Sequence, residues 1–528
     1  MPTVLITDPV HPVCDELLAA AGITIRTALK KTDDELAAIA GDADGWIVRS
    51  GTQISARLLE AAPNLKVVGR AGVGVDNVDV EAATHRGVLV LNAPEGNTIS
   101  TAEHTIAMLL ALARHIAAAA ASLRDGKWDR KSFTGAELYG KTLGVVGAGK
   151  IGRAVAERLG PFGMTVLAYD PLLAPEAAER SGVTLVELDE LISRSDYITV
   201  HTPLIDATRG LFNTASIARC KPGVRFINCA RGGIIDEADL LEALESGHVA
   251  GAALDVYSIE PPTEAVMRLV RHPHVVATPH IAASTDEAQE KVARQVTEEV
   301  IKALNDEPVV NAVNGLAIRM AAAGEVKPFL DLAERMGRAA RQMSEGQVGR
   351  VLLRCHGDVP RRYAEVLLLS AVKGLMSGMV TGPVNLVNAR ILAEETGLRT
   401  DTGTFHDASG YTNVLELVVT SPADELTLAG SLSGAGDPRL VRVDDFQAEV
   451  RLEGHLLVYR NADRPGMLAR VGAVLAEAGV NIAGLALGRR ARGGLALTAI
   501  SLDERVPDSV LITITGLDGV EAVRRVDV

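Results

Sequence analysis

The sequence predicts an α/β protein with parallel sheets, and two observations support this fold class. A short apolar run over residues 142–146 leads into a glycine-rich turn, a helix-like run, and a second apolar run over 164–169 that ends in Asp170. Upstream, residues 1–98 alternate strand-like and helix-like runs. Strands that alternate with helices are typical of parallel sheets. We therefore predict a doubly wound domain of the Rossmann type, preceded by a smaller α/β domain.

The glycine-rich turn has the spacing G-x-G-x-x-G. One glycine allows the tight turn, one lets the backbone approach a pyrophosphate, and one lets helix and strand pack closely. The pyrophosphate then lies at a helix N-terminus, where N–H groups and the helix dipole favour an anion. A lone motif of this kind also marks ordinary turns, but here strand, helix and acid are all in place. We expect cofactor contacts from Gly147, Gly149, Lys150, Ile151 and Gly152.

Asp170 predicts which dinucleotide binds. It lies 18 residues after Gly152, where a carboxylate can accept both ribose hydroxyls and repel a 2′-phosphate. The expected cofactor is therefore NAD rather than NADP.

Composition limits the classes of function. A chain of 528 residues is too long for one core and suggests about three or four domains. The formal net charge of −14 argues against a nucleic-acid partner, because a phosphate backbone needs a basic surface. The N-terminus reads as a strand rather than a signal peptide, and no uncharged apolar run reaches the roughly 18 residues of a membrane span. We expect a cytoplasmic protein with no membrane partner.

The cysteines indicate neither a disulfide framework nor a metal site. No two of them have C-x-x-C spacing, and we expect no metal. The four residues are Cys14, Cys220, Cys229 and Cys355.

The first two predicted domains are a flavodoxin-like substrate-binding domain over 1–98 and the dinucleotide domain over 99–282. The segment 283–314 is expected to return to the first of them. A single long helix over 100–123 is predicted, with Ser100 and Glu103 as a capping box. Such a helix could connect domains or lie in a dimer interface.

Two further domains are expected after residue 314. Residues 315–452 predict an α/β intervening domain, with helices over 326–343 and 364–375 and strands over 350–355 and 415–420. Residues 453–528 read β-α-β-β-α-β, which is the order of a ferredoxin-like module.

Three side chains with complementary chemistry follow successive strands of the dinucleotide domain. Oxidation of a hydroxyl by hydride transfer needs a base for the proton, and His280 follows an apolar strand at the edge where ligands bind. A carboxylate such as Glu260 would fix the imidazole, and the planar guanidinium of Arg231 can hold a substrate carboxylate. Separately, each could be a capping histidine, a solvated acid or a surface turn residue. Because all three follow strands at the same edge of the predicted sheet, we interpret them as catalytic residues.

Basic residues in the first domain predict a site for an anionic substrate. Arg70 opens a glycine loop after a strand, and the N–H groups of such a loop can hold a carboxylate. Arg49 has a similar position at the end of the strand over 45–48. The predicted substrate contacts are Arg49, Ser50, Arg70, Gly72 and Gly74, with a further basic patch at Arg130 and Lys131. That patch could equally be a solvated turn.

At these motifs the chain resembles the NAD-dependent D-2-hydroxyacid dehydrogenases. The matching segments are GRAGVGVDNVD (69–79), VVGAGKIG (145–152), CARGGIIDE (229–237), ALDVYSIEPP (253–262) and TPHIAAST (278–285). One departure is Ala282, where the family usually has glycine. With its two C-terminal domains, the whole chain is similar to the long-form members that oxidise 3-phosphoglycerate in serine biosynthesis.

The resemblance implies roles for further residues. Arg231, Glu260 and His280 would be the catalytic trio, and Asp255 would bind the nicotinamide carboxamide. Arg130 and Lys131 would reach the phosphate of a neighbouring subunit's substrate in a homo-oligomer, expected to be a tetramer. Further positions along the cofactor would be Thr202, Pro203, Cys229 and Ala230. We interpret Cys229 as a small packing residue rather than a nucleophile, since no base is near it in sequence.

The final module resembles an ACT domain, which binds amino acids between paired copies. Asp463 could bind a ligand ammonium, and Asn461 and Asn481 could supply amide bonds, so we expect these three to cluster at one end and to bind L-serine as a feedback effector. Plain turn chemistry is the alternative for them. For the whole chain, the alternatives are another D-2-hydroxyacid dehydrogenase, acting on glycerate or 2-hydroxyglutarate, and a dinucleotide-sensing binding protein.

Overall fold

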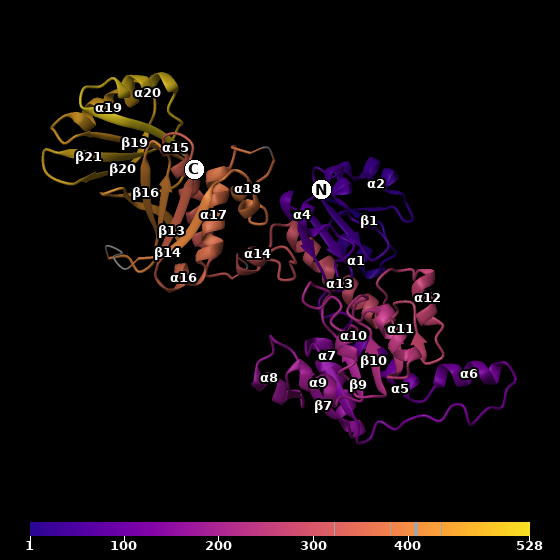
Figure 1. Ribbon diagram of the computed structural model, residues 1–528. Helices are drawn as coiled ribbons and strands as arrows, with labels where there is room; N and C mark the ends of the chain where they lie inside the picture. The colour runs from indigo at the N-terminus through magenta and orange to yellow at the C-terminus, as the bar shows by residue number, and fades with distance from the viewer. Residues whose placement is uncertain (322, 381, 406–409, 435) are drawn as a thin grey trace. The chain divides into compact units, whose positions relative to one another are not determined.

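The computed structural model describes residues 1–321, 323–380, 382–405, 410–434 and 436–528 (Figure 1). The chain forms two compact units. Unit 1 contains Met1–Asn92 and Val296–Val528, and unit 2 contains Ala93–Gln295. The chain passes from unit 2 back to unit 1 within α13 (Asp286–Leu304).

Unit 1 begins with a five-stranded parallel sheet in the order β2-β1-β3-β4-β5. This is the flavodoxin-like order, which confirms the predicted fold of the first domain. The central strand β3 is buried along its whole length, with Trp46 at its middle. The strands are β1 (Thr3–Ile6), β2 (Thr24–Thr27), β3 (Gly45–Val48), β4 (Val67–Arg70) and β5 (Leu89–Leu91), and the helices between them are α1 (Val13–Ala20), α2 (Asp33–Ile39), α3 (Ala56–Glu60) and α4 (Val80–His85).

The C-terminal part of α13 packs on this first sheet. A side chain at Gly69 of β4 would meet Val300 at 2.6 Å and Val296 at 3.0 Å, so the absence of one lets the helix approach. Leu91 of β5 also forms an antiparallel bridge with Ala312.

Unit 2 contains a seven-stranded parallel sheet in the order β12-β11-β10-β9-β6-β7-β8. The chain winds in one direction from β6 to β8 and in the other from β9 to β12, so the order reverses between β6 and β9. That reversal is the place where doubly wound sheets bind ligands. The strands are β6 (Thr142–Val146), β7 (Thr165–Tyr169), β8 (Thr184–Leu185), β9 (Tyr197–Val200), β10 (Val224–Asn228), β11 (Val249–Leu254) and β12 (Val275–Ala277), with helices that include α7 (Lys150–Leu159), α9 (Leu188–Arg194), α11 (Glu237–Glu245) and α12 (Glu264–Val270).

The prediction of one long helix over 100–123 is wrong. The structure has α5 (Thr98–Ala113) and α6 (Ile116–Arg124), which are bent by 65° at a short break. His115 has a φ of 52°, and a left-handed residue of this kind cannot continue a right-handed helix. The predicted capping box is also wrong, because α5 begins before Ser100 and the Ser100 hydroxyl lies 2.8 Å from that of Thr285.

α5 and α6 have different surroundings. α5 is packed into unit 2 through residues such as Leu109 and Leu112, whereas α6 buries none of its residues and stands away from the rest of the unit (Figure 1). No single helix in the described part of the chain is long and apolar enough to cross a membrane, and these two pass that test only as a bent pair.

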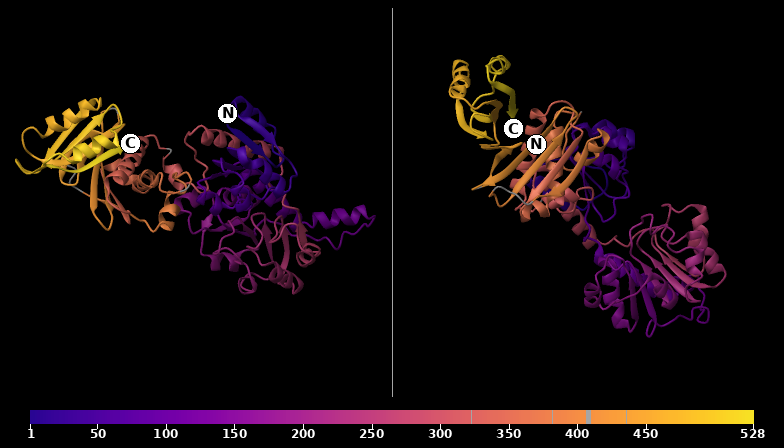
Figure 2. Two further views of the ribbon diagram at one scale, coloured as in Figure 1. Left: turned by 90° about the horizontal axis from the view of Figure 1, so that it is seen from above. Right: turned by 60° about the vertical axis from the view of Figure 1, so that its left-hand side comes forward.

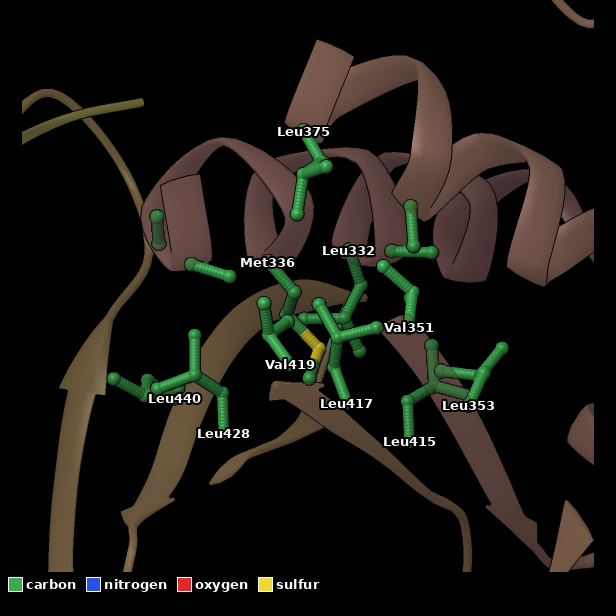
Figure 3. Packing of buried hydrophobic residues seen from close by; sticks show 14 of the residues in the cluster. Leu332, Met336, Val351, Leu353, Leu375, Leu415, Leu417, Val419, Leu428 and Leu440 are labelled. Atoms are coloured by element: carbon green, nitrogen blue, oxygen red, sulfur yellow. The ribbon is translucent and has the colours of Figure 1, made fainter. Parts of the chain in front are cut away.

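The third sheet belongs to the intervening domain in unit 1. Its six strands have the order β14-β13-β15-β16-β17-β18, and α15 (Lys327–Met343) and α17 (Ala364–Met376) cover one face. Figure 3 shows Leu332 and Met336 of α15 pointing toward Leu417 and Val419 of the sheet. The strands are β13 (Arg350–His356), β14 (Arg399–Thr404), β15 (Val414–Thr420), β16 (Glu425–Ser433), β17 (Asp437–Val443) and β18 (Phe446–Arg451).

The last sheet confirms the ferredoxin-like module, with the order β20-β21-β19-β22. Helices α19 (Met467–Glu477) and α20 (Asp508–Thr515) lie on one face (Figure 2). Its strands are β19 (His455–Ala462), β20 (Ile482–Arg489), β21 (Leu495–Leu502) and β22 (Val520–Asp527).

The two faces of this last sheet belong to different cores. On β19, Leu457 and Tyr459 pack under the two helices, whereas Leu456 and Val458 join the core of the intervening domain. The residues alternate between the two cores because successive side chains of a strand point to opposite faces of the sheet. The ACT module and the intervening domain therefore share one continuous hydrophobic core.

Candidate active site

The glycine turn after β6 has the geometry that a dinucleotide needs. Gly147 has a φ of 90°, and a side chain there would meet the carbonyl of His201 at 2.9 Å. A side chain at Gly152 would lie 2.1 Å from the carbonyl oxygen of Gly147. At Gly149, in contrast, an added Cβ meets nothing within 4 Å, which leaves the turn open on the side of the helix N-terminus. Gly147 thus allows the tight turn, Gly152 allows close packing of helix and strand, and Gly149 leaves space for a pyrophosphate. These are the three features that a dinucleotide-binding turn needs, so the residues fit NAD.

Asp170 lies beside that turn at the end of β7. Its Oδ2 accepts the N–H of Ala148 at 2.9 Å, and its Oδ1 accepts the N–H of Leu172 at 2.9 Å. The carboxylate is thus held against the glycine turn where a ribose would lie. The other predicted turn residues differ in exposure, since Ile151 is half-buried and Lys150 is exposed and paired with Glu95.

Residues after β9 and β10 border the same edge of the sheet. His201 precedes Thr202 and Pro203, and burial lowers the pKa of His201 to about 4. Cys229 is buried, and this burial raises its pKa to about 12. A thiol with that pKa is not a nucleophile near neutral pH, which agrees with a packing role.

His280 and Glu260 form a hydrogen-bonded pair. Nδ1 of His280 lies 2.7 Å from Oε2 of Glu260, and both side chains are partly exposed. The other carboxylate oxygen, Oε1, accepts the N–H of Tyr257 at 3.0 Å. Burial alone would raise the pKa of Glu260, but the bonds from His280 and Tyr257 outweigh it and hold the pKa below the ordinary value. The pair provides a base with an ionised partner at neutral pH.

Asp255 supports the segment that carries His280. It is fully buried, and it accepts the Thr278 hydroxyl at 2.6 Å and the N–H groups of Ile281 and Ala282 at 2.9 Å each. His104 is a further neighbour, with Nε2 at 3.4 Å. Burial would raise the pKa of Asp255, but these four bonds lower it. The resemblance implied a contact with the nicotinamide carboxamide, whereas the contacts in the structure hold both flanks of His280.

Three features position Arg231 after β10. The buried Asn228 accepts the N–H of Ala230 at 3.0 Å and donates to the carbonyl of Arg231 at 2.8 Å, so it fixes the turn. Nη1 of Arg231 donates to the carbonyl of Ala230 at 2.7 Å. Sequence reasoning missed Asn228, although an asparagine that ends a buried apolar strand is a signal for turn bonding.

In unit 1, a buried carboxylate holds the loop that carries Arg49 and Ser50. Oδ2 of Asp8 accepts the N–H groups of Arg49, Gly51 and Thr52 at 2.7, 3.1 and 3.0 Å. From the other side, Asn77 donates to the carbonyl of Arg49 at 2.7 Å. Asp8 and Asn77 were also missed by sequence reasoning, because neither lies next to the residues that it positions.

The glycine loop after β4 makes room for Arg70. The N–H of Gly72 donates to the carbonyl of Arg70 at 2.8 Å, and a Cβ at Gly72 would lie 1.4 Å from Nη1 of Arg70. The guanidinium therefore folds over Gly72, while Gly74 lies half-buried two residues further along the loop.

Arg130 and Lys131 lie in an exposed segment after α6 in unit 2. Oδ1 of Asp129 accepts the N–H of Lys131 at 3.1 Å and that of Ser132 at 3.2 Å, which forms a local turn. The adjacent Trp128 is 80% exposed.

The predicted effector residues do not cluster at one end of the ACT sheet, so that expectation is wrong. Asn461 pairs with Ala496, at the start of β21, whereas Asn481 precedes Ile482, which pairs with Leu502 at its end. Ala496 and Leu502, the β21 residues next to them, are about 20 Å apart along the strand. The physical reason is that a β-α-β crossover returns the chain to the end where its first strand began.

The contacts of these three residues also differ. Asn461 is buried and accepts the Thr498 hydroxyl at 3.0 Å, so its amide supports the sheet. Asp463 is more accessible, and bonds from the N–H of Gly493 and from Arg489 lower its pKa. Asn481 is exposed and donates to Asp503 at 2.6 Å.

Three segments of the chain match known domain families. Residues 106–282 match the NAD-binding domain of D-isomer specific 2-hydroxyacid dehydrogenases. Residues 325–444 match the intervening domain of D-3-phosphoglycerate dehydrogenase, and residues 455–513 match the ACT domain.

Relatives cover nearly the whole chain. D-3-phosphoglycerate dehydrogenase of Bacillus subtilis is 42% identical over 484 residues, which are 92% of this chain and 92% of that protein. The enzyme of the same name from Mycobacterium tuberculosis is 42% identical over 516 residues, 97% of this chain and 96% of that one.

Solved structures match a shorter part. A glyoxylate reductase from Paecilomyes thermophila is 30% identical, has a TM-score of 0.55 and covers 59% of this chain and 98% of its own. D-lactate dehydrogenase from Aquifex aeolicus, solved with NAD and lactic acid, is 28% identical, has a TM-score of 0.52 and covers 58% of this chain and 96% of its own.

Proposed function

Because the chain belongs to the D-3-phosphoglycerate dehydrogenase family of NAD-dependent D-2-hydroxyacid dehydrogenases, we propose that it oxidises 3-phospho-D-glycerate to 3-phosphohydroxypyruvate, the first step of L-serine biosynthesis. The observation that carries this proposal is the 2.7 Å contact between His280 and Glu260 at the ligand edge of the dinucleotide sheet. It joins a base to an ionised partner beside the strand ends where doubly wound sheets bind ligands.

The residues of unit 2 supply the chemistry. Bound at the glycine turn, NAD supplies the acceptor for the substrate's C2 hydride. His280 takes the proton of the C2 hydroxyl, and Glu260 stabilises the imidazolium that results. Arg231 binds the substrate carboxylate and polarises the C2 oxygen. Asp170 binds the ribose hydroxyls, and we place Asp255 in support of His280.

The residues of unit 1 bind the acidic substrate. Arg49 and Arg70 provide charged hydrogen bonds, and the N–H groups of the loops at Ser50, Gly72 and Gly74 provide neutral ones. The clamp from Asp8 supports this role, because a loop held by a buried carboxylate is preorganised for binding.

We propose a homo-oligomer in which α6 packs against a second copy of the chain. α6 has no buried residue, and large apolar side chains are exposed on it and on the segment that follows, namely Ile116, Leu123, Trp128 and Tyr139. Single apolar residues are normal on a surface, but a whole helix without a buried side is not. In that oligomer, Arg130 and Lys131 would contact the phosphate of the neighbouring copy's substrate. A tetramer would result if the ACT modules pair as well.

We propose that the ACT module binds L-serine between two copies. β20 is an edge strand that exposes Ile482, Leu485 and Leu487, and Arg489 at its C-terminal end lies 3.2 Å from Asp463. If two copies of β20 pair antiparallel about a two-fold axis, Asn481 of the second copy comes to the end where Asp463 lies. This arrangement would join residues that lie at opposite ends of one chain's sheet.

The test of the proposed function is NAD reduction by the purified protein with 3-phosphoglycerate, glycerate, lactate and 2-hydroxyglutarate, each with and without L-serine. We expect 3-phosphoglycerate to be the preferred substrate and serine to inhibit. Preference for glycerate, lactate or 2-hydroxyglutarate would assign the chain to another activity of the same fold. Tight NAD binding without any turnover would favour a dinucleotide sensor.

A further inference from the structure

The proposed catalytic carboxylate, Glu260, lies on an exposed turn. Ser258, Ile259 and Glu260 are all exposed, whereas Tyr257 is buried. Glu260 is bonded at one oxygen to His280 and at the other to the N–H of Tyr257. Its place against the imidazole therefore depends on where the backbone of residues 257 and 258 lies.

A second carboxylate holds that backbone. Oε1 of Glu237 accepts the N–H of Ser258 at 2.6 Å, and its Oε2 accepts the hydroxyl of the same serine at 2.6 Å. Glu237 is the first residue of α11, and Asp236 caps this helix by accepting the N–H groups of Ala238 and Asp239 at 3.0 Å each. The anchor for the turn is thus carried by a capped helix rather than by another loop.

The loop that carries Arg231 meets the same two residues. A Cβ at Gly232 would lie 1.9 Å from the carbonyl carbon of Tyr257 and 2.4 Å from the nitrogen of Ser258, so the two backbones touch there. Tyr257 also contacts the segment that carries His280. Its hydroxyl donates to the carbonyl of Thr278, two residues before His280, at 3.0 Å. The segments that carry all three proposed catalytic residues therefore meet at Tyr257 and Ser258.

We propose that Glu237 is a positioning residue for the dehydrogenation. It fixes Ser258 to α11, and through that residue it sets Glu260 against His280 and beside the Arg231 loop. The inference rests on the proposed function, because the catalytic roles of Glu260 and His280 are part of that proposal. Glu237 itself has no contact with either side chain that would make it a participant in proton transfer.

The test compares three full-length variants with the wild type in the oxidation of 3-phosphoglycerate. Glu237→Ala removes both bonds to Ser258. Glu237→Gln keeps an acceptor for the N–H of Ser258 and a polar partner for its hydroxyl. Glu242→Ala is the matched control, because Glu242 is an exposed glutamate of the same helix that lines the same surface pocket and carries the same charge. Melting temperature and NAD affinity are measured for each variant.

We expect Glu237→Ala to lower kcat by roughly 10- to 100-fold while KM for either substrate changes by less than about threefold, since a misplacement of about 1 Å can cost about 10²-fold in rate. The pH profile should change with it: the acid limb of kcat/KM should move to lower pH, because a displaced carboxylate no longer favours the protonated imidazole. Glu237→Gln should recover most of the rate, and Glu242→Ala should match the wild type.

The inference is overturned if Glu237→Ala keeps wild-type kcat and pH profile. It is also overturned if kcat falls only together with NAD affinity and melting temperature and Glu237→Gln restores none of it, since that pattern describes a purely structural residue. If the wild type itself fails to oxidise 3-phosphoglycerate, the proposed function fails instead, and the two failures are thereby separate.

Discussion

The carboxylate of Glu260 lies 2.7 Å from Nδ1 of His280, and the second oxygen of the same carboxylate accepts the N–H of Tyr257 at 3.0 Å. His280 has a φ of 54°, an unfavourable backbone conformation for a residue with a side chain. Asp255 compensates by bonding the N–H groups of the two residues that follow. The imidazole is therefore held from the backbone side by one carboxylate and from the ring side by another.

His280→Ala is expected to abolish most of the turnover while leaving NAD binding intact. General acid–base catalysis contributes about 10²- to 10⁴-fold, so kcat should fall by a factor in that range. The measurement is steady-state NADH formation together with calorimetric NAD binding. His274→Ala, which removes an exposed histidine of the same unit, serves as the control. Near-normal turnover in His280→Ala would mean that another group takes the proton.

Glu260→Gln is expected to change the pH dependence of oxidation. Burial would raise the pKa of Glu260, but the bonds from His280 and Tyr257 outweigh it and lower the pKa, so the carboxylate is ionised at neutral pH and is protonated only as pH falls through that lowered value. An uncharged amide no longer favours the protonated imidazole. The acid limb of kcat/KM should therefore move to lower pH, with a reduced plateau. An unchanged profile would contradict the pairing.

The cysteines are expected to resist alkylation in the folded protein. All four are buried, and burial raises the pKa of Cys220, Cys229 and Cys355 to about 12 and raises that of Cys14 as well. Thiolate is the reactive form, and very little of it exists at pH 8. Mass spectrometry after iodoacetamide treatment should find no native adducts and four adducts in urea. Rapid modification of Cys229 with loss of activity would contradict its packing role.

Asp463→Ala is expected to relieve inhibition by L-serine with little effect on uninhibited turnover. Removal of the ammonium partner weakens serine binding, and an effector acts only through its differential affinity for two states. Asn481→Ala should behave in the same way if two copies close the site. Serine inhibition curves and calorimetry provide the measurement. Equal serine affinity in both variants and the wild type would place the effector elsewhere.

Deletion of residues 453–528 is not a clean test of that site. Leu456, Val458, Leu497 and Val526 of the ACT module belong to the core of the intervening domain, and their removal would expose it. Point variants are therefore preferable to truncation.

Sequence patterns predicted the parts of the fold that depend on local signals. The glycine turn, Asp170 and the three groups after β10, β11 and β12 each follow an apolar strand, and parallel strands bring their ends to one edge of a sheet. The break at His115 was not predicted, because residues that favour helix lie on both sides of it, with Ala and Leu before it and alanines after it, and only the backbone conformation of His115 ends α5.

Contacts distant in sequence were the least predictable. Asp8 and Glu237 accept backbone N–H groups that lie up to 44 and 21 residues away, and no periodicity indicates such a partner. Alternation in β19 predicted a strand but not that its two faces would join separate cores. The placement of Asn461 and Asn481 at opposite ends of the ACT sheet, in contrast, follows from the β-α-β order and could have been predicted.

The most direct test of the central claim is the ratio of kcat/KM for 3-phospho-D-glycerate to that for D-glycerate, with NAD, in the wild type and in Arg70→Ala. Each charged hydrogen bond to the phosphate is worth about 1.5–3 kcal/mol, so we predict a wild-type ratio of at least about 10². The ratio should fall by about tenfold or more in Arg70→Ala if this residue binds the phosphate. A wild-type ratio near one would contradict the claim that this protein is built to oxidise 3-phosphoglycerate.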